Sequence, residues 1–169
     1  ADVKLSLNFD DKSEQKYKLS RMSEKSVDFE GDVPQKGTFK GGKTVSTIDM
    51  VFTKSIDSVD PQGNAIEKIV INELKYKAES KGRVVMAFDS NREVDVKDNP
   101  LSKLIGYSYK LKRASDNQIL DVIYETEPEE LFKNGSTLAK VALRLVNEEM
   151  IRERHAMVTL PEKKNNELS

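Results

Sequence analysis

Apolar residues alternate with polar ones through most of the chain up to Tyr124, and this period of two predicts long β-strands. The first such run spans Val3 to Phe9. The same alternation returns in segments 17–29, 44–59, 66–78, 83–89, 107–111 and 119–124. The run at 44–59 changes phase near Ser55, which predicts a β-bulge or a bend. We therefore expect seven or eight strands.

Turn residues separate these strands at short intervals. Asp60 to Asn64 is the clearest turn, because its proline suits the second turn position and its glycine tolerates a positive φ. Further turns are predicted at 80–82 and 116–117, and a loop at 31–42. Asn99 to Gly106 predicts a helical insert. Short connections between long strands predict an antiparallel meander that coils strongly into an open barrel or half-barrel.

The C-terminal part of the chain has the residue spacing of helices. Glu127 to Phe132 predicts one short helical turn with a proline near its start. Ser136 can cap a second helix that runs to about His155. One face of this helix carries the apolar side chains Leu138, Val141, Ala142, Leu145 and Val146. We expect this helix to cover the coiled sheet.

These elements predict an α+β fold in a single domain over residues 1–161, with the helix at about 136–155 packed on the sheet. An extended exit at 157–161 and a disordered tail at 162–169 are expected to follow. The length of 169 residues is enough for one hydrophobic core. A hydrophobic share of 37% and a charged share of 34% suit a sheet with one solvated face.

Charge and composition exclude several classes of function. Balanced totals of 28 basic and 29 acidic residues give a net charge of −1, so we expect no general attraction to nucleic acid. We interpret the basic run Lys16, Lys18, Arg21 and Lys25 as the solvated face of a strand. The absence of cysteine excludes disulfides and thiolate chemistry. No apolar segment reaches the length of about 20 residues that a membrane span requires.

His155 is the one histidine of the chain and the first candidate for chemistry. A serine-hydrolase triad would need it, but no serine in a glycine elbow accompanies it. We interpret it as a cation near the end of an exposed helix. Glu149 and Glu153 follow the apolar face of the same helix, which predicts that they pair with Arg152 or a basic strand residue, or lie in water.

Two groups of side chains invite comparison with metal sites: Asp57, Asp60 and Asn64, and then Asp89, Asp95 and Asp98. Neither spacing matches a calcium-binding loop, so we interpret both groups as turn and cap residues. Paired acids can hydrolyse glycosides, but the chain has no tryptophan to form a sugar platform. Tyr107 and Tyr109 are predicted to line a core or cavity. We expect no catalytic residue, no metal and no cofactor.

Several segments, in this order, resemble a family of uncharacterised exported bacterial proteins: Phe88-Asp89-Ser90, Asn99-Pro100-Leu101, Leu104 to Tyr109 and Ile119 to Val122. The resemblance covers roughly Ile48 to Pro161. Members are β-rich, often lipoproteins, and classed as a domain of unknown function. The resemblance implies a periplasmic or cell-surface location, with a lipid anchor upstream of Ala1. A coiled sheet wrapped on a helix is also loosely similar to periplasmic lipoprotein carriers.

The pattern favours an exported, non-enzymatic module that binds a hydrophobic ligand or a protein partner in the concavity of the sheet. The alternative is a structural or assembly domain of the bacterial cell envelope that uses exposed strand edges or the helix end. An envelope hydrolase with two acids is a third hypothesis. A large apolar cavity between helix and sheet would favour carriage, whereas a filled core would favour scaffolding.

Overall fold

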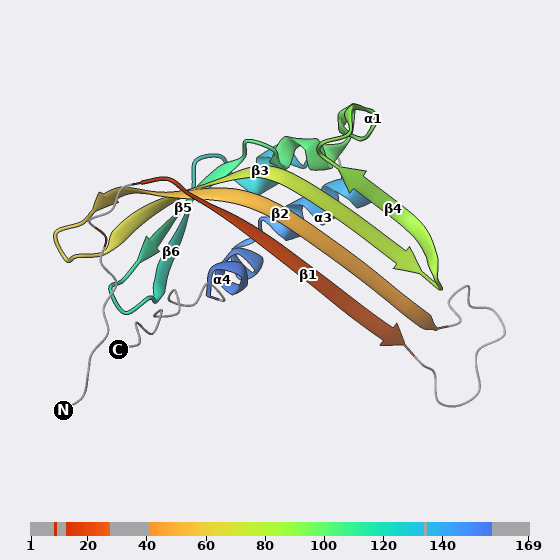
Figure 1. The fold of residues 1–169 in the computed structure, drawn as a ribbon, viewed down its shortest axis with the longest axis horizontal. Helices are drawn as coiled ribbons and strands as arrows, with labels where there is room; N and C mark the ends of the chain where they lie inside the picture. The colour runs from red at the N-terminus through yellow and green to blue at the C-terminus, as the bar shows by residue number, and fades with distance from the viewer. Residues whose placement is uncertain (1–8, 10–12, 28–40, 134, 157–169) are drawn as a thin grey trace, which may run out of the picture.

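The computed structural model describes residues 9, 13–27, 41–133 and 135–156. Within them, six antiparallel strands form one sheet. These strands are β1 (Gln15–Val27), β2 (Gly42–Val59), β3 (Ala65–Ser80), β4 (Arg83–Asp89), β5 (Ser108–Arg113) and β6 (Ile119–Tyr124). The sheet is open (Figure 1), so the predicted antiparallel sheet is confirmed and the predicted open barrel or half-barrel is not.

The strand count within the described residues is six, not the seven or eight that the alternation predicts. Residues 3–8 of the predicted first strand lie outside the described part of the chain. So do residues 31–40 of the predicted loop, the exit at 157–161 and the tail at 162–169. The remaining predicted strands agree with the structure to within a few residues.

One edge of β3 is shared by two strands that are far apart along the chain. The half of β3 from Lys75 to Ser80 pairs with β4, and the half from Ala65 to Val70 pairs with β5. Between these strands the chain forms α1 (Glu93–Val96) and the 3₁₀ helix η1 (Pro100–Leu104), whose first turn is capped by the side chain of Asn99. The predicted helical insert is therefore confirmed, and it returns the chain to the edge that it left.

The predicted irregularity in the second long strand is also present. The pairing of β2 with β3 shifts register between Ile56 and Ser58, just after the phase change near Ser55. A second shift lies between Val51 and Phe52. Such irregularities bend a strand and increase its twist, which fits the curved outline of the sheet in Figure 1.

The prediction of one continuous helix over 136–155 is wrong. The structure has the short helix α2 (Pro128–Leu131) and then two helices, α3 (Thr137–Leu145) and α4 (Glu148–Ala156). At the break, Asn147 caps α4 by accepting a hydrogen bond from the amide of Met150 at 2.8 Å. The Val146 carbonyl accepts one from the hydroxyl of Tyr124 at 2.9 Å. These bonds satisfy backbone groups that a continuous helix would pair internally.

The core lies between one face of the sheet and the helices, which cover that face in Figure 1. Its fully buried side chains include Met50, Ile69, Ile71, Leu74, Leu101, Leu104, Tyr109, Leu111 and Ile151. Tyr107 is buried as well, so the predicted core role of Tyr107 and Tyr109 is confirmed. The side chains of sheet and helices occupy the layer between them.

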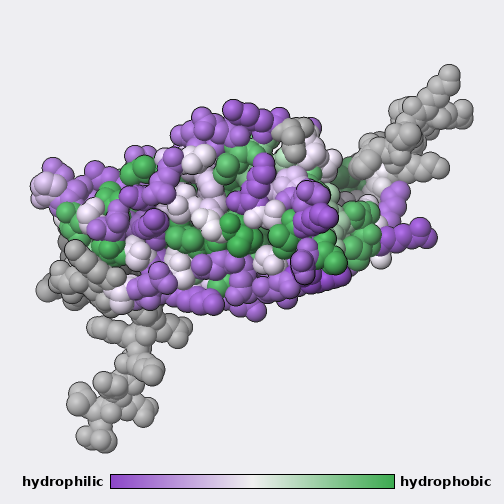
Figure 2. All heavy atoms as spheres, turned by 90° about the horizontal axis from the view of Figure 1, so that it is seen from above, coloured by the Kyte–Doolittle hydropathy of each residue, from purple (hydrophilic) through white to green (hydrophobic). Residues whose placement is uncertain are grey.

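The exposed large apolar residues are spread over several elements: Met22, Val59, Val84, Val85, Val94, Ile105, Leu120 and Ile123. Figure 2 shows apolar side chains interspersed with hydrophilic ones on the face that it presents. Scattered exposure of this kind is ordinary for a folded domain. Within the described residues, no helix combines the length and apolar character needed to cross a membrane.

Candidate functional site

A groove runs between the edge strand β1 and the helices α3 and α4, and we call it the edge groove. Its volume is about 290 Å³. It is lined by Leu19, Ser20, Arg21, Met22, Ile48, Leu145, Met150, Glu153 and Arg154. The lining therefore combines one strand pair with the last residue of α3 and three residues of α4.

The apolar walls of the edge groove come from both layers of the fold. Leu19 lies on β1, and Ile48 lies on β2 opposite Arg21 in the strand pairing. Leu145 is the last residue of α3, and Met150 lies in the first turn of α4. Because the chain breaks between these helices, side chains from two different helix ends reach the same groove.

An ion pair joins the sheet to α4 beside these walls. Nη1 of Arg21 lies 3.0 Å from Oε2 of Glu153, and both side chains are partly exposed. This is the pairing with a basic strand residue that the sequence left open for Glu153. Arg152 instead pairs with Glu148, whose Oε1 lies 2.8 Å from Nη2 of Arg152. Glu149 is exposed.

Arg154 is the unusual residue of the edge groove, since only 6% of it is exposed. Its Nη1 donates a hydrogen bond to the hydroxyl of Tyr109 at 3.2 Å, and its Nη2 donates to the carbonyl of Leu145. Both acceptors are neutral. Among the described residues no carboxylate lies within ion-pair distance of this guanidinium, so a buried positive charge stands without a counter-ion.

His155 does not lie at an exposed helix end, and that interpretation is wrong. It is 1% exposed, and its Nε2 lies 2.7 Å from the Tyr109 hydroxyl oxygen. That hydroxyl accepts from Arg154, which has no acceptor atom. Among the described contacts this leaves Nε2 of His155 as the acceptor for the hydroxyl proton, which favours the tautomer with the ring proton on Nδ1. Burial, and then the charges of Arg154, Arg113 and Lys54, hold the pKa of His155 well below its usual value.

A second buried polar cluster links β2, β3 and β5. Glu67 and Arg113 are each 2% exposed, and their Oε2 and Nε atoms are 2.9 Å apart. Nζ of Lys54 lies 3.3 Å from Oε1 of Glu67, and Arg113 also donates to the side-chain oxygen of Asn117. Each charge in this cluster thus has a partner of opposite sign, unlike that of Arg154.

The buried charges of Glu67, Arg113 and Arg154 were not predicted from the sequence, although a signal was present for the first two. Glu67 has the same phase on β3 as Ile69 and Ile71, and Arg113 has the same phase on β5 as Leu111. Charged residues at these inward positions indicate a buried pair. Arg154 carries no such signal, because its helix has little apolar periodicity.

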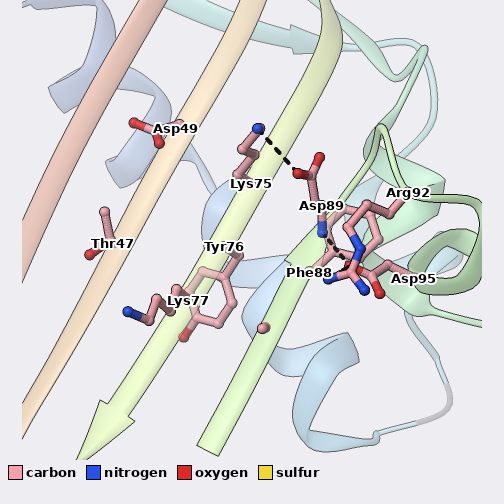
Figure 3. Close-up of a pocket in the computed structure, with 10 residues that line it drawn as sticks. Thr47, Asp49, Lys75, Tyr76, Lys77, Phe88, Asp89, Arg92 and Asp95 are labelled. Carbon is pink, nitrogen blue, oxygen red and sulfur yellow. Dashed lines mark hydrogen bonds and ion pairs between the residues drawn. The ribbon is translucent and has the colours of Figure 1, made fainter. Parts of the chain in front are cut away.

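A second groove, of about 360 Å³, lies mainly on the opposite face of the sheet (Figure 3). Its charged lining consists of Asp49, Lys75, Lys77, Asp89, Arg92 and Asp95. Lys75 pairs with Asp89 at 3.1 Å and Arg92 with Asp95 at 3.6 Å. Asp95 also accepts from the backbone amide of Asp89 at 3.0 Å. Three cations thus face three carboxylates, which leaves no net charge for a ligand to neutralise.

Asp60 acts on the backbone of its own turn, as interpreted from the sequence. Oδ1 of Asp60 accepts from the amides of Gln62 and Asn64, each at 2.9 Å. The hydrogen bonds from Asn64 are the main cause of the lowered pKa of Asp60. Asp57 instead accepts from Lys110, at 2.8 Å. Over residues 13–27, 41–133 and 135–156, no group of three or more histidine or acidic side chains is placed to hold a metal.

The basic run on β1 divides between the two faces. Lys16 and Lys18 are exposed, as interpreted, and Lys16 lies 3.8 Å from Glu73. Arg21 is half-buried and belongs to the edge groove.

Comparison with known protein families, curated proteins and solved structures finds no match to this chain.

Proposed function

We propose that this chain is a non-enzymatic binding module whose edge groove takes a small ligand with an apolar part. The observation that carries the proposal is the meeting of apolar walls from sheet and helices beside the buried Arg154. A volume of about 290 Å³ lies at the lower end of the range for small-molecule pockets. The ligand is therefore small, and it binds beside the core rather than within it.

The wider setting is part of the same proposal. The segments that resemble exported bacterial proteins suggest a module outside the cytoplasm, in the periplasm or at the cell surface. The sheet is then an open half-barrel, in which strands of 18 and 16 residues curve over the helices. The filled layer between sheet and helices argues against carriage of a long lipid in the interior.

Calorimetric titration with octanoate and with 1-octanol tests the proposal, since both have a short apolar chain. We expect at least one of them to bind with a stoichiometry of one. Met150→Trp would fill the groove with an indole ring and weaken binding at least ten-fold. Met86→Trp is the matched control, because Met86 is also half-buried but lies on β4 and does not line the groove.

The three outcomes of this experiment are clearly separated. Binding that Met150→Trp weakens and Met86→Trp leaves unchanged supports the edge groove. If the unmodified protein binds neither compound, the proposed function fails whatever the variants do. If both variants bind as tightly as the unmodified protein, the ligand site lies elsewhere.

Assembly in the cell envelope is the second candidate, and the edge of β1 favours it. Within the described residues, this strand of 13 residues pairs only with β2. An unpaired edge can accept a further strand from a partner. Light scattering over a range of concentrations, combined with a pull-down from envelope extracts, tests this candidate. A strict monomer that captures no envelope protein would contradict it.

A further inference from the structure

We propose that the edge groove selects a monoanion with an acyl chain of medium length, such as octanoate, and that Arg154 binds its carboxylate head group. This inference rests on the proposed function and names the class of ligand. It goes further because an apolar groove alone would not distinguish a fatty acid from an alcohol. The charge of the groove makes that distinction.

The charged residues of the edge groove do not cancel. Arg21 and Glu153 neutralise each other in their ion pair at 3.0 Å. Arg154 has no acidic partner among the described residues, so the groove keeps one positive charge. A buried charge without a counter-ion is unfavourable, and an anion that enters beside it removes that penalty.

The guanidinium of Arg154 also has N–H donors that its hydrogen bonds to Tyr109 and Leu145 do not use. It carries five N–H donors, and two hydrogen bonds, to Tyr109 and Leu145, are present within the described structure. Three donors remain for a ligand. Carboxylates suit such donors, because their two oxygens can accept a pair of parallel hydrogen bonds from one guanidinium. The bond to Tyr109 also restrains the guanidinium before any ligand arrives.

The apolar lining determines the hydrocarbon chain of the ligand and its length. Leu19, Ile48 and Met150 offer hydrocarbon contacts next to the charged group. At about 30 Å³ per atom, the share of a water molecule in the liquid, a volume of about 290 Å³ holds roughly ten non-hydrogen atoms. Octanoate has about that number. Much longer chains would have to leave the groove and expose their tails.

The groove on the opposite face provides an internal comparison. It is the larger of the two, at about 360 Å³. Its three cations and three carboxylates balance, and two of its ion pairs are closed within the groove itself. Volume alone would favour it as a ligand site. Of these two grooves, only the edge groove combines a buried unmatched charge with apolar walls, so we place the anion there.

Calorimetric titrations of the unmodified protein with octanoate, 1-octanol and octylammonium test the inference directly. We expect octanoate to bind at least ten-fold more tightly than octanol, and octylammonium to bind most weakly. Arg154→Met should weaken octanoate at least ten-fold and bring it level with octanol, while Arg154→Lys should retain part of the preference. Arg144→Met is the control, since it removes an exposed cation from α3 that does not line the groove.

The comparison of octanoate with octanol on the unmodified protein is decisive even if Arg154→Met fails to fold. If octanol binds the unmodified protein as tightly as octanoate does, the charge selection is wrong and the proposed function stands. If neither compound binds, the proposed function fails as well. If Arg144→Met weakens octanoate as much as Arg154→Met does, the attraction is a general effect of charge and not the work of Arg154.

Discussion

The hydroxyl oxygen of Tyr109 lies 2.7 Å from Nε2 of His155, and this contact ties strand β5 to helix α4 inside the protein. Arg154 donates to the same hydroxyl oxygen, at 3.2 Å. The Tyr109 hydroxyl therefore serves two neighbours that are adjacent in the sequence and buried together. It fixes the helix that forms one side of the edge groove.

Tyr109→Phe removes this hydroxyl while keeping the ring. We expect a loss of about 1 to 3 kcal/mol in the free energy of unfolding, because the substitution leaves a buried acceptor and a buried cationic donor without their partner. Urea denaturation measures this change in the free energy of unfolding. Tyr107→Phe is the control, since that hydroxyl makes a single hydrogen bond to the carbonyl of Thr126. Equal losses in the two variants would contradict the special role of Tyr109.

The buried His155 makes stability depend on pH. Its folded-state pKa is lowered by burial, whereas the unfolded chain takes up a proton near the usual value of about 6.5. Below that pH the unfolded state binds the proton and the folded state does not, so stability falls as the pH falls. The slope approaches about 1.4 kcal/mol per pH unit.

Denaturation curves between about pH 7.5 and 5.5 measure this slope, because the usual pKa of histidine lies in that window. His155→Gln should flatten it, since glutamine does not titrate and can still accept from Tyr109. The chain has no other histidine to obscure the comparison. A slope that His155→Gln leaves unchanged would show that His155 is not its source.

The pair formed by Glu67 and Arg113 should be sensitive to the loss of one partner. Glu67→Leu leaves the buried guanidinium without its carboxylate, and we expect a loss of about 3 to 5 kcal/mol. The double variant Glu67→Leu with Arg113→Met should recover much of that loss, because no buried guanidinium then lacks a partner and Lys54, the other partner of Glu67, is partly exposed. Thermal denaturation of the three proteins compares them. A double variant that is no more stable than Glu67→Leu alone would count against this explanation.

The break between α3 and α4 depends on the cap at Asn147. Asn147→Ala removes the acceptor for the amide of Met150 and should cost about 1 kcal/mol of stability. Asn147→Asp keeps an acceptor oxygen at the helix start and should restore that stability. Chemical denaturation measures both variants. If Asn147→Ala is as stable as the unmodified protein, the cap at Asn147 does not maintain the break between α3 and α4.

Much of the sheet could be predicted from the sequence, because alternation and turn residues act locally. The pairing of β2 with β3 follows from the turn at Asp60 to Asn64, and the Asn99 cap marks the helical insert. The return of β5 to the edge of β3 beside β4 could not be predicted, since that choice depends on packing across the whole sheet.

The candidate site was harder to predict than the fold. A continuous helix follows from the spacing of Leu138 to Val146, but the Tyr124 hydrogen bond that helps to end it comes from a distant strand. The break changes which side of α4 meets the sheet. That is why Arg154 and His155 are buried, although their local sequence is highly charged. The burial of both residues is a tertiary effect.

The most direct test of the edge groove uses the methyl groups of the five methionines as reporters in a carbon-13 NMR titration with octanoate. Met22 and Met150 line the groove, whereas Met50 is in the core and Met86 lies on β4. We expect the signals of Met150 and Met22 to shift and saturate together, while that of Met86 stays in place. Saturating shifts at Met86 with none at Met150 would contradict the account.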